Sequence, residues 1–154
     1  MIEPDLVFIT QEILFMIEDK ILIVDEDQST REMTEKYLFN HGYQVKTAKS
    51  PMDALRVLDN ERFPIVLTAL KMNGLNGLEM CKQIKRRNLN CVVYALSSYL
   101  KEYDPEQLES FGFDGYIKKP IRTEILDAAI KGAMDKLRRF TFCKNSGHRP
   151  ESTP

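Results

Sequence analysis

Short apolar runs alternate along the chain with longer segments of helical periodicity. The apolar runs begin near Ile21, Tyr43, Ile65, Cys91 and Phe113, and each has the length of a strand. In the five segments that follow them, apolar residues recur every three or four positions, as on one face of a helix. Alternating strands and helices are typical of a parallel sheet covered on both faces and joined by right-handed crossovers. The pattern therefore predicts a doubly wound α/β domain.

Ile65, Val66 and Leu67 form an apolar, β-branched run, too short for a helix, which predicts the buried central strand. Pro64 precedes it, and a turn is expected at Asn73-Gly74. In an open α/β sheet, ligands and chemistry collect outside the carboxyl ends of the strands. This strand ends at Ala69, whose methyl group cannot act as a nucleophile, a base or a metal ligand.

Capping signals set the expected helix boundaries. A capping box from Ser29 to Glu32 predicts the start of the first helix, which ends at Gly42. Ser50, before a proline, starts a second helix that runs to about Asn60. The expected inner-face residues of the first helix are Met33, Tyr37 and Leu38.

Three further helices follow from the same rules. The third begins after Gly77 and carries a basic cluster, residues 85–87, that we expect in solvent at the helix end. The fourth begins at Asp104 and the last at Thr123. His41 is interpreted as a partner of the first helix's C-terminal dipole. The expected inner face of the last helix is Ile125, Leu126, Ala129, Ile130, Met134 and Leu137.

Composition favours one soluble domain. The 154 residues are 43% hydrophobic and 29% charged, and the net charge of −1 gives no general case for nucleic acid or an anionic membrane. Cys81, Cys91 and Cys143 lack metal-site spacing and fit a reduced compartment. The apolar segment 6–17 contains polar residues and is shorter than the roughly 20 residues of a membrane-spanning helix. We expect a cytoplasmic protein with no membrane or nucleic-acid partner.

Two extensions flank the predicted domain, which covers residues 20–138. Residues 1–19 show helical spacing and are interpreted as an N-terminal helix that packs on the domain or belongs to an upstream linker. A dimerisation helix is the alternative. Residues 139–154 are basic and contain serine, proline and glycine, which predicts a flexible tail.

Polar side chains gather at the expected strand ends. Asp25 and Glu26 follow the first strand, Ala69 ends the third, Ser97 closes the fourth and Lys119 follows the fifth. We expect all five residues to face one crevice.

These pieces resemble the receiver domain of bacterial two-component response regulators. The resemblance rests on residues 21–27, 66–77, 95–97 and 116–120, and it spans residues 20–138. It implies a flavodoxin-like five-stranded sheet with the order 2-1-3-4-5, and a non-enzymatic role in phosphorelay signalling. The implied partners are a histidine kinase, a phosphotransfer protein or another receiver, met on the face of the fourth helix, fifth strand and fifth helix. The resemblance does not decide whether the chain forms a homodimer.

The resemblance also implies roles for single residues. Asp25 and Glu26 match the acid pair that holds Mg²⁺, and the carbonyl of Lys71 matches a backbone metal ligand. Lys119 matches the lysine that pairs with the acyl phosphate, and Ser97 matches the hydroxyl that contacts a phosphoryl oxygen. Two more matches are Tyr116, the switch aromatic, and Pro120, which usually follows a cis peptide bond in the family.

The departure from the family is Ala69, which stands where the phosphorylatable aspartate is expected. Without that carboxylate there is no nucleophile for an acyl phosphate, and Mg²⁺ binding is expected to be weakened though not forbidden. Asn73 stands where the family usually has proline. Ala69 fits a natural pseudo-receiver or an engineered replacement of aspartate, and Asn73 favours the first. We expect Lys119 to pair with Asp25 or Glu26 in the resting state.

A cofactor-binding or enzymatic domain of the same flavodoxin-like architecture is the rival hypothesis. Phosphate binding there needs a glycine-rich loop after the first strand, where this chain has the acids 25–27. A DNA-binding regulator would need a helical output module, and too few residues follow Arg138 for one. If the chain is full-length, output through protein contact is therefore expected.

Overall fold

The computed structural model describes residues 20–98 and 103–145, with side chains described up to residue 140. The predicted N-terminal helix, and the tail beyond residue 145, lie outside the described residues. The strands are β1 (Lys20–Val24), β2 (Gln44–Ala48), β3 (Ile65–Ala69), β4 (Val92–Ser97) and β5 (Gly115–Lys118). The helices are α2 (Gln28–Asn40), α3 (Pro51–Asn60), α4 (Gly77–Arg87), α5 (Pro105–Ser110) and α6 (Thr123–Asn145).

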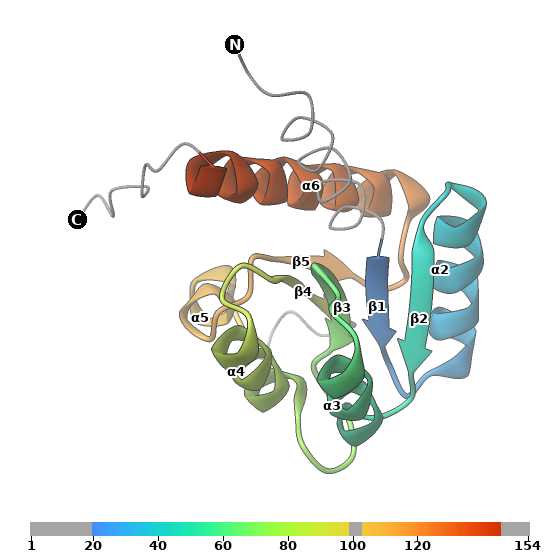
Figure 1. Cartoon of the computed structure of the whole chain (residues 1–154). Coiled ribbons are helices and arrows are strands. Elements are labelled where there is room, and N and C mark those ends of the chain that lie inside the picture. The colour runs from blue at the N-terminus through green and yellow to red at the C-terminus, as the bar shows by residue number, and fades with distance from the viewer. Residues whose placement is uncertain (1–19, 99–102, 146–154) are drawn as a thin grey trace.

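The five strands form one parallel sheet in the order β2-β1-β3-β4-β5, which confirms the predicted topology (Figure 1). The order reverses between β1 and β3, which pair with Ile21 opposite Ile65. Every residue of β3 is buried, as expected of a central strand covered on both faces. The carboxyl ends of the strands therefore meet at one edge, where the predicted site residues stand.

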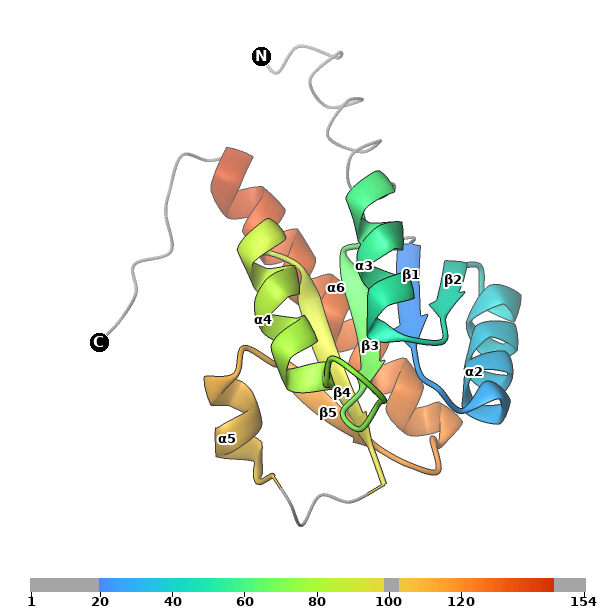
Figure 2. The same cartoon turned by 90° about the horizontal axis from the view of Figure 1, so that it is seen from below.

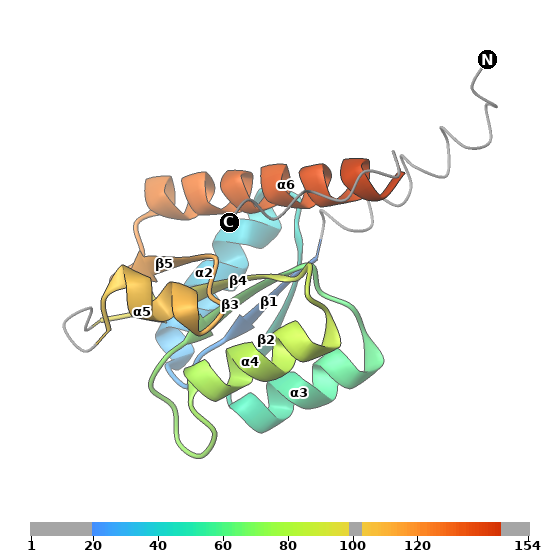
Figure 3. The same cartoon turned by 90° about the vertical axis from the view of Figure 1, so that its left-hand side faces the viewer.

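Helices cover both faces of the sheet and enclose two separate cores. Figure 3 shows α2 and α6 on one face and α3 and α4 on the other, and Figure 2 shows α3 and α4 in front of the sheet with α6 behind it. Successive residues of β1 point to opposite faces, so Ile21 and Ile23 join the core under α2 and α6, while Leu22 and Val24 join the other. Leu108 of α5 packs in that second core.

The start of α2 differs from the prediction. The helix begins at Gln28 after Asp27, so the predicted capping box beginning at Ser29 is wrong. Thr30 Oγ1 donates to Asp27 Oδ2 at 2.5 Å, and this hydrogen bond holds the pKa of Asp27 below its usual value. Of the predicted inner face, Leu38 is buried and Tyr37 packs against the core, but Met33 is 50% exposed and Thr34 is buried in its place. Thr34 can be buried because its hydroxyl donates to the Thr30 carbonyl at 2.7 Å.

The other helix boundaries agree more closely with the sequence signals. Ser50, Asn76 and Asp104 accept hydrogen bonds from backbone N–H groups at the starts of α3, α4 and α5. Gly42 after α2 has a φ of 91°, as predicted for the residue that ends that helix. Tyr37 Oη donates to Asp127 Oδ2 at 2.8 Å, which joins α2 to α6.

The last helix is longer than expected, and one residue predicted on its inner face is exposed. It continues to Asn145, so residues 139–145 are helical rather than part of a flexible tail. The sequence allows this, since neither glycine nor proline occurs between Gly132 and Gly147. Ile125, predicted on the inner face, is 50% exposed, whereas Leu126, Ile130 and Leu137 are buried as expected.

Candidate functional site

The end of β1 places a buried carboxylate at the edge of the sheet. Asp25 is nearly inaccessible to solvent, and its Oδ1 accepts a hydrogen bond from the Asp27 N–H at 3.0 Å. Its own N–H donates to the Ala48 carbonyl at 3.1 Å, which extends the pairing with β2 by one residue. The Arg31 guanidinium reaches back from α2 and donates to the carbonyls of Asp25 and Glu26 at 2.7 and 3.0 Å. These contacts fix the backbone that carries both acids.

Lys119 pairs with Asp25 across the edge of the sheet. The ammonium Nζ lies 2.5 Å from Asp25 Oδ2, which makes no hydrogen bond of normal geometry, so the contact is best described as an ion pair. The Lys119 N–H donates to the Ser97 carbonyl at 2.9 Å, and the peptide bond before Pro120 is cis, as expected. The predicted pairing of Lys119 with an acid of the first strand is confirmed.

Glu26 is engaged from the opposite side of the crevice. Its Oε1 accepts a hydrogen bond from the backbone N–H of Asn73, which lies in the loop between β3 and α4. Sequence reasoning placed Asn73 in a turn and noted it as a departure from the family, but missed this contact. The sequence signal for this contact is the absence of the proline that the family usually has at residue 73. Unlike proline, asparagine has a backbone N–H that can donate a hydrogen bond.

Ala69 lies at the carboxyl end of β3, as predicted, and is buried there. Gly77, the first residue of α4, packs directly against it and donates its N–H to the Leu70 carbonyl at 3.0 Å. A Cβ atom at residue 77 would lie 2.3 Å from the Ala69 carbonyl oxygen, so only glycine allows this approach. The α4 N-terminus is therefore held against the end of the central strand.

A cavity of about 150 Å³ opens beside Ala69. Its lining comprises Ala69, Leu70, Lys71, Leu96, Ser97, Ser98, Tyr103 and Lys119. A neighbouring hollow of about 320 Å³ is bordered by Glu26, Lys71 and Asn73, among others. The structure thus gathers Ala69, Ser97 and Lys119 around one cavity, with Asp25 joined to it through Lys119. Tyr116 of β5 does not line either hollow and is 42% exposed.

The resemblance to receiver domains implies a Mg²⁺ ion held by Asp25 and Glu26. The ion takes about six oxygen ligands in octahedral geometry. Within residues 20–98 and 103–145, no group of three or more acids, histidines or cysteines is placed to hold a metal. The carboxylates of Asp25 and Glu26 are engaged by Lys119 and Asn73. In this conformation the residues do not fit the ion.

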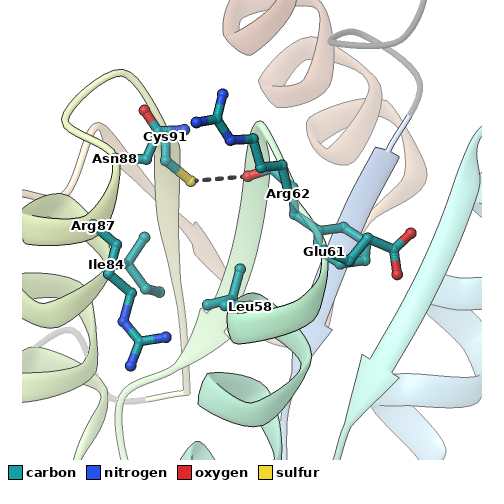
Figure 4. Close-up of a pocket in the computed structure, with 8 residues that line it drawn as sticks. Leu58, Glu61, Arg62, Ile84, Arg87, Asn88 and Cys91 are labelled. Atoms are coloured by element: carbon teal, nitrogen blue, oxygen red, sulfur yellow. Dashed lines mark hydrogen bonds between the residues drawn. The ribbon is translucent and has the colours of Figure 1, made fainter.

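A third depression lies at the amino ends of β3 and β4, away from the candidate site (Figure 4). It measures about 100 Å³ and is lined by Leu58, Glu61, Arg62, Phe63, Ile84, Arg87, Asn88 and Cys91. Cys91 Sγ donates to the Phe63 carbonyl at 3.2 Å, and burial raises the pKa of its thiol to about 12. A thiol with that pKa is not a nucleophile at neutral pH, so we assign no chemistry to this depression.

The sheet order and the cavity at the carboxyl strand ends define a flavodoxin-like α/β domain. The sequence profile of the response regulator receiver domain matches residues 21–131. The chain belongs to this family, whose role is phosphorelay signal transduction, and the rival cofactor-binding hypothesis is not favoured. Receiver domains contact kinases and other signalling proteins and are generally not enzymes.

Known relatives agree with this assignment. A cyclic di-GMP phosphodiesterase of Thermotoga maritima is 31% identical over 82% of this chain and 33% of its own length. The response regulator SaeR of Staphylococcus aureus is 28% identical over 78% of this chain and 52% of its own length. The chain thus spans about half or less of these curated relatives. A CheY-like receiver domain protein of Methanospirillum hungatei is 26% identical over 79% of this chain and 97% of its own, with a TM-score of 0.74.

Among the described helices, none has the length and apolar character needed to cross a membrane.

Proposed function

We propose that this receiver domain works as a pseudo-receiver, which contacts its signalling partners without accepting a phosphoryl group at residue 69. The observation that carries the proposal is the Ala69 methyl group at the carboxyl end of β3, on the cavity that also contains Ser97 and Lys119. An acyl phosphate forms by attack of a carboxylate on the phosphoryl donor, and a methyl group cannot make that attack.

In this proposal the remaining site residues hold one conformation that does not depend on phosphorylation. Lys119 neutralises Asp25 instead of an acyl phosphate, and Ser97 packs at the cavity wall close to it. Tyr116, the expected switch aromatic, is partly exposed on β5. Its ring is available to a partner without any phosphorylation step. No metal role is assigned to the Lys71 carbonyl, because the two acids expected beside it are engaged.

The partner surface we propose is the face formed by α5, β5 and α6, which includes Tyr116. The occupants that suit a receiver domain are a histidine kinase, a phosphotransfer protein or a second receiver, including a second copy of this chain. We place the protein in the cytoplasm, where such kinases and phosphotransfer proteins act.

Phosphoryl transfer from acetyl phosphate tests the proposal. The protein is incubated with acetyl phosphate and Mg²⁺, and its mass is measured by intact mass spectrometry. A receiver domain that retains its aspartate is the positive control. We expect an adduct on the control and none on this chain. A hydroxylamine-sensitive phosphoryl adduct on this chain, on Asp25, Glu26 or any other carboxylate, would overturn the proposal.

A further inference from the structure

A hydrogen bond between Glu26 and Asn73 joins the end of β1 to the loop on the other side of the crevice. Glu26 follows β1, and Asn73 lies 47 residues later, in the loop that joins β3 to α4. The donor is the backbone N–H of Asn73 and the acceptor is Glu26 Oε1. A proline at residue 73 has no N–H and could not form this bond. The contact therefore depends on the backbone of residue 73 and not on its side chain.

Both acids of the crevice are engaged within the chain. Asp25 is paired with Lys119 at 2.5 Å, and Glu26 is bound to the loop through Asn73. A divalent cation held by both carboxylates, as the family's acid pair holds it, would compete with both of these contacts. A third carboxylate added at residue 69 would supply a new ligand but would not release Glu26 from Asn73.

We propose that Asn73 is a specificity-determining residue, whose backbone N–H holds Glu26 and closes the crevice against divalent cations. The loop of residues 70–76 is then anchored to β1 by the protein itself instead of by Mg²⁺. Restoring a carboxylate with Ala69→Asp leaves the crevice closed, and the ion enters readily only when the N–H of residue 73 is also removed. The inference rests on the proposed function, because a receiver that is not phosphorylated does not need the ion.

Residue 73 offers a matched pair of variants. Asn73→Ala removes the side chain and keeps the N–H, whereas Asn73→Pro removes the N–H. If the closure acts through the backbone, only the proline variant opens the crevice. The two variants separate the effect of the hydrogen bond from any effect of the asparagine amide.

Titration calorimetry with MgCl₂ measures the effect on three proteins: Ala69→Asp, Ala69→Asp/Asn73→Ala and Ala69→Asp/Asn73→Pro. We expect the proline variant to bind Mg²⁺ about tenfold more tightly than the other two. This factor corresponds to the free-energy contribution of one charge-assisted hydrogen bond. Equal affinity of all three proteins would overturn the inference. So would a gain in Asn73→Ala equal to that in Asn73→Pro.

A second measurement needs no proline variant and tests the hydrogen bond on which the inference depends. The amide proton of Asn73 is followed by NMR in the unmodified chain, in Glu26→Gln and in Glu26→Ala. We expect a downfield, slowly exchanging proton that persists in Glu26→Gln, which keeps an acceptor oxygen, and is lost in Glu26→Ala. An Asn73 amide proton that is the same in all three proteins would show that the bond is absent.

The two proposals fail separately. An acyl phosphate on the unmodified chain would remove the proposed function and leave the Asn73 amide result untouched. Equal Mg²⁺ affinities in the three variants would remove the closure by Asn73 and leave the loss of the nucleophile at Ala69 as it is.

Discussion

Lys119 and Asp25 form an ion pair that connects the carboxyl ends of β5 and β1, which are not neighbours in the sheet. Asp25 directly follows β1 and Lys119 directly follows β5, and in the sheet β3 and β4 lie between these strands. The side chains retain 18% and 3% exposure, so the pair is largely removed from water. With a methyl group at Ala69, the pair spans the space that a third carboxylate would otherwise share. The Asp25 carboxylate therefore has its counter-ion within the protein, without a bound metal ion.

Removing Lys119 is expected to destabilise the domain. Lys119→Met leaves the Asp25 carboxylate buried without its counter-ion, and we expect the free energy of unfolding to fall by about 3 kcal/mol. The double variant Asp25→Asn/Lys119→Met should recover most of that loss, because no charge is then left buried. Urea denaturation measures both values. The matched control is Lys118→Met, an exposed neighbour, for which we expect a change within about 0.5 kcal/mol. Equal losses in Lys118→Met and Lys119→Met would contradict this account.

Asp114 organises a second charged cluster on the far side of the domain. Its Oδ2 accepts from Lys85 Nζ at 2.7 Å and from the Val93 N–H at 2.8 Å, and its Oδ1 is paired with Lys136. Lys85 also donates to the Cys91 carbonyl at 2.6 Å. One carboxylate thus joins α4, β4 and α6 at the start of β5. The cluster ties the proposed partner surface to the rest of the sheet.

The stabilisation by Asp114 should depend on pH. Burial raises the pKa of Asp114, but the hydrogen bonds from Lys136, Lys85 and Val93 outweigh it, so this pKa lies below its ordinary value of 3.8. A depressed pKa in the folded state means that the stabilisation is complete above about pH 4 and is lost as the pH falls through the folded-state value. We expect Asp114→Asn to be less stable than the unmodified chain by about 3 kcal/mol at neutral pH. Urea midpoints measured near pH 7 and near pH 3 should show that gap shrinking; a constant gap would count against the assignment.

The sequence was sufficient to predict the fold and the placing of the site, because both follow from local signals. Buried strands are apolar runs, and the caps at Ser50 and Asp104 are short motifs that act within a few residues. Once the strands are parallel and ordered, residues after their carboxyl ends must meet. This is why Asp25, Ala69 and Lys119 could be assigned to one crevice before the structure was known.

Two of the contacts that were missed depend on partners far away in the chain, and one is local. Lys85 was expected in solvent because it stands in a basic cluster at a helix end, but Asp114, 29 residues later, draws it into the domain. Thr34 is buried in place of Met33 because its hydroxyl can bond to the helix backbone, an option that a purely hydrophobic pattern does not register. The bond from Asn73 to Glu26 required the loop geometry.

The thiols of Cys81 and Cys91 should be inert in the folded protein. Both are buried, and burial raises the pKa of each to about 12. The thiolate is the reactive form, so at about pH 8 we expect alkylation by iodoacetamide to be at least about a hundredfold slower than in urea. Peptide mass spectrometry resolves each site and keeps Cys143 separate. Rapid labelling of Cys81 or Cys91 in the folded chain would be inconsistent with this burial.

Gly77 and Gly132 should respond in opposite directions to alanine. At Gly77 a new Cβ would lie 2.3 Å from the Ala69 carbonyl oxygen and 2.9 Å from Leu70 Cα, and these backbone atoms cannot move without shifting the end of β3.

At Gly132, which is exposed within α6, the nearest atom to a new Cβ is Tyr94 Oη at 3.6 Å, an ordinary contact. We expect Gly77→Ala to lower the free energy of unfolding by about 2 kcal/mol through overpacking. Gly132→Ala should raise it by about 0.5–1 kcal/mol, because alanine favours a helix interior over glycine. Urea denaturation followed by circular dichroism measures both changes. A neutral Gly77→Ala would mean that α4 does not begin against the end of β3, and the loop that carries Asn73 would then have to lie elsewhere.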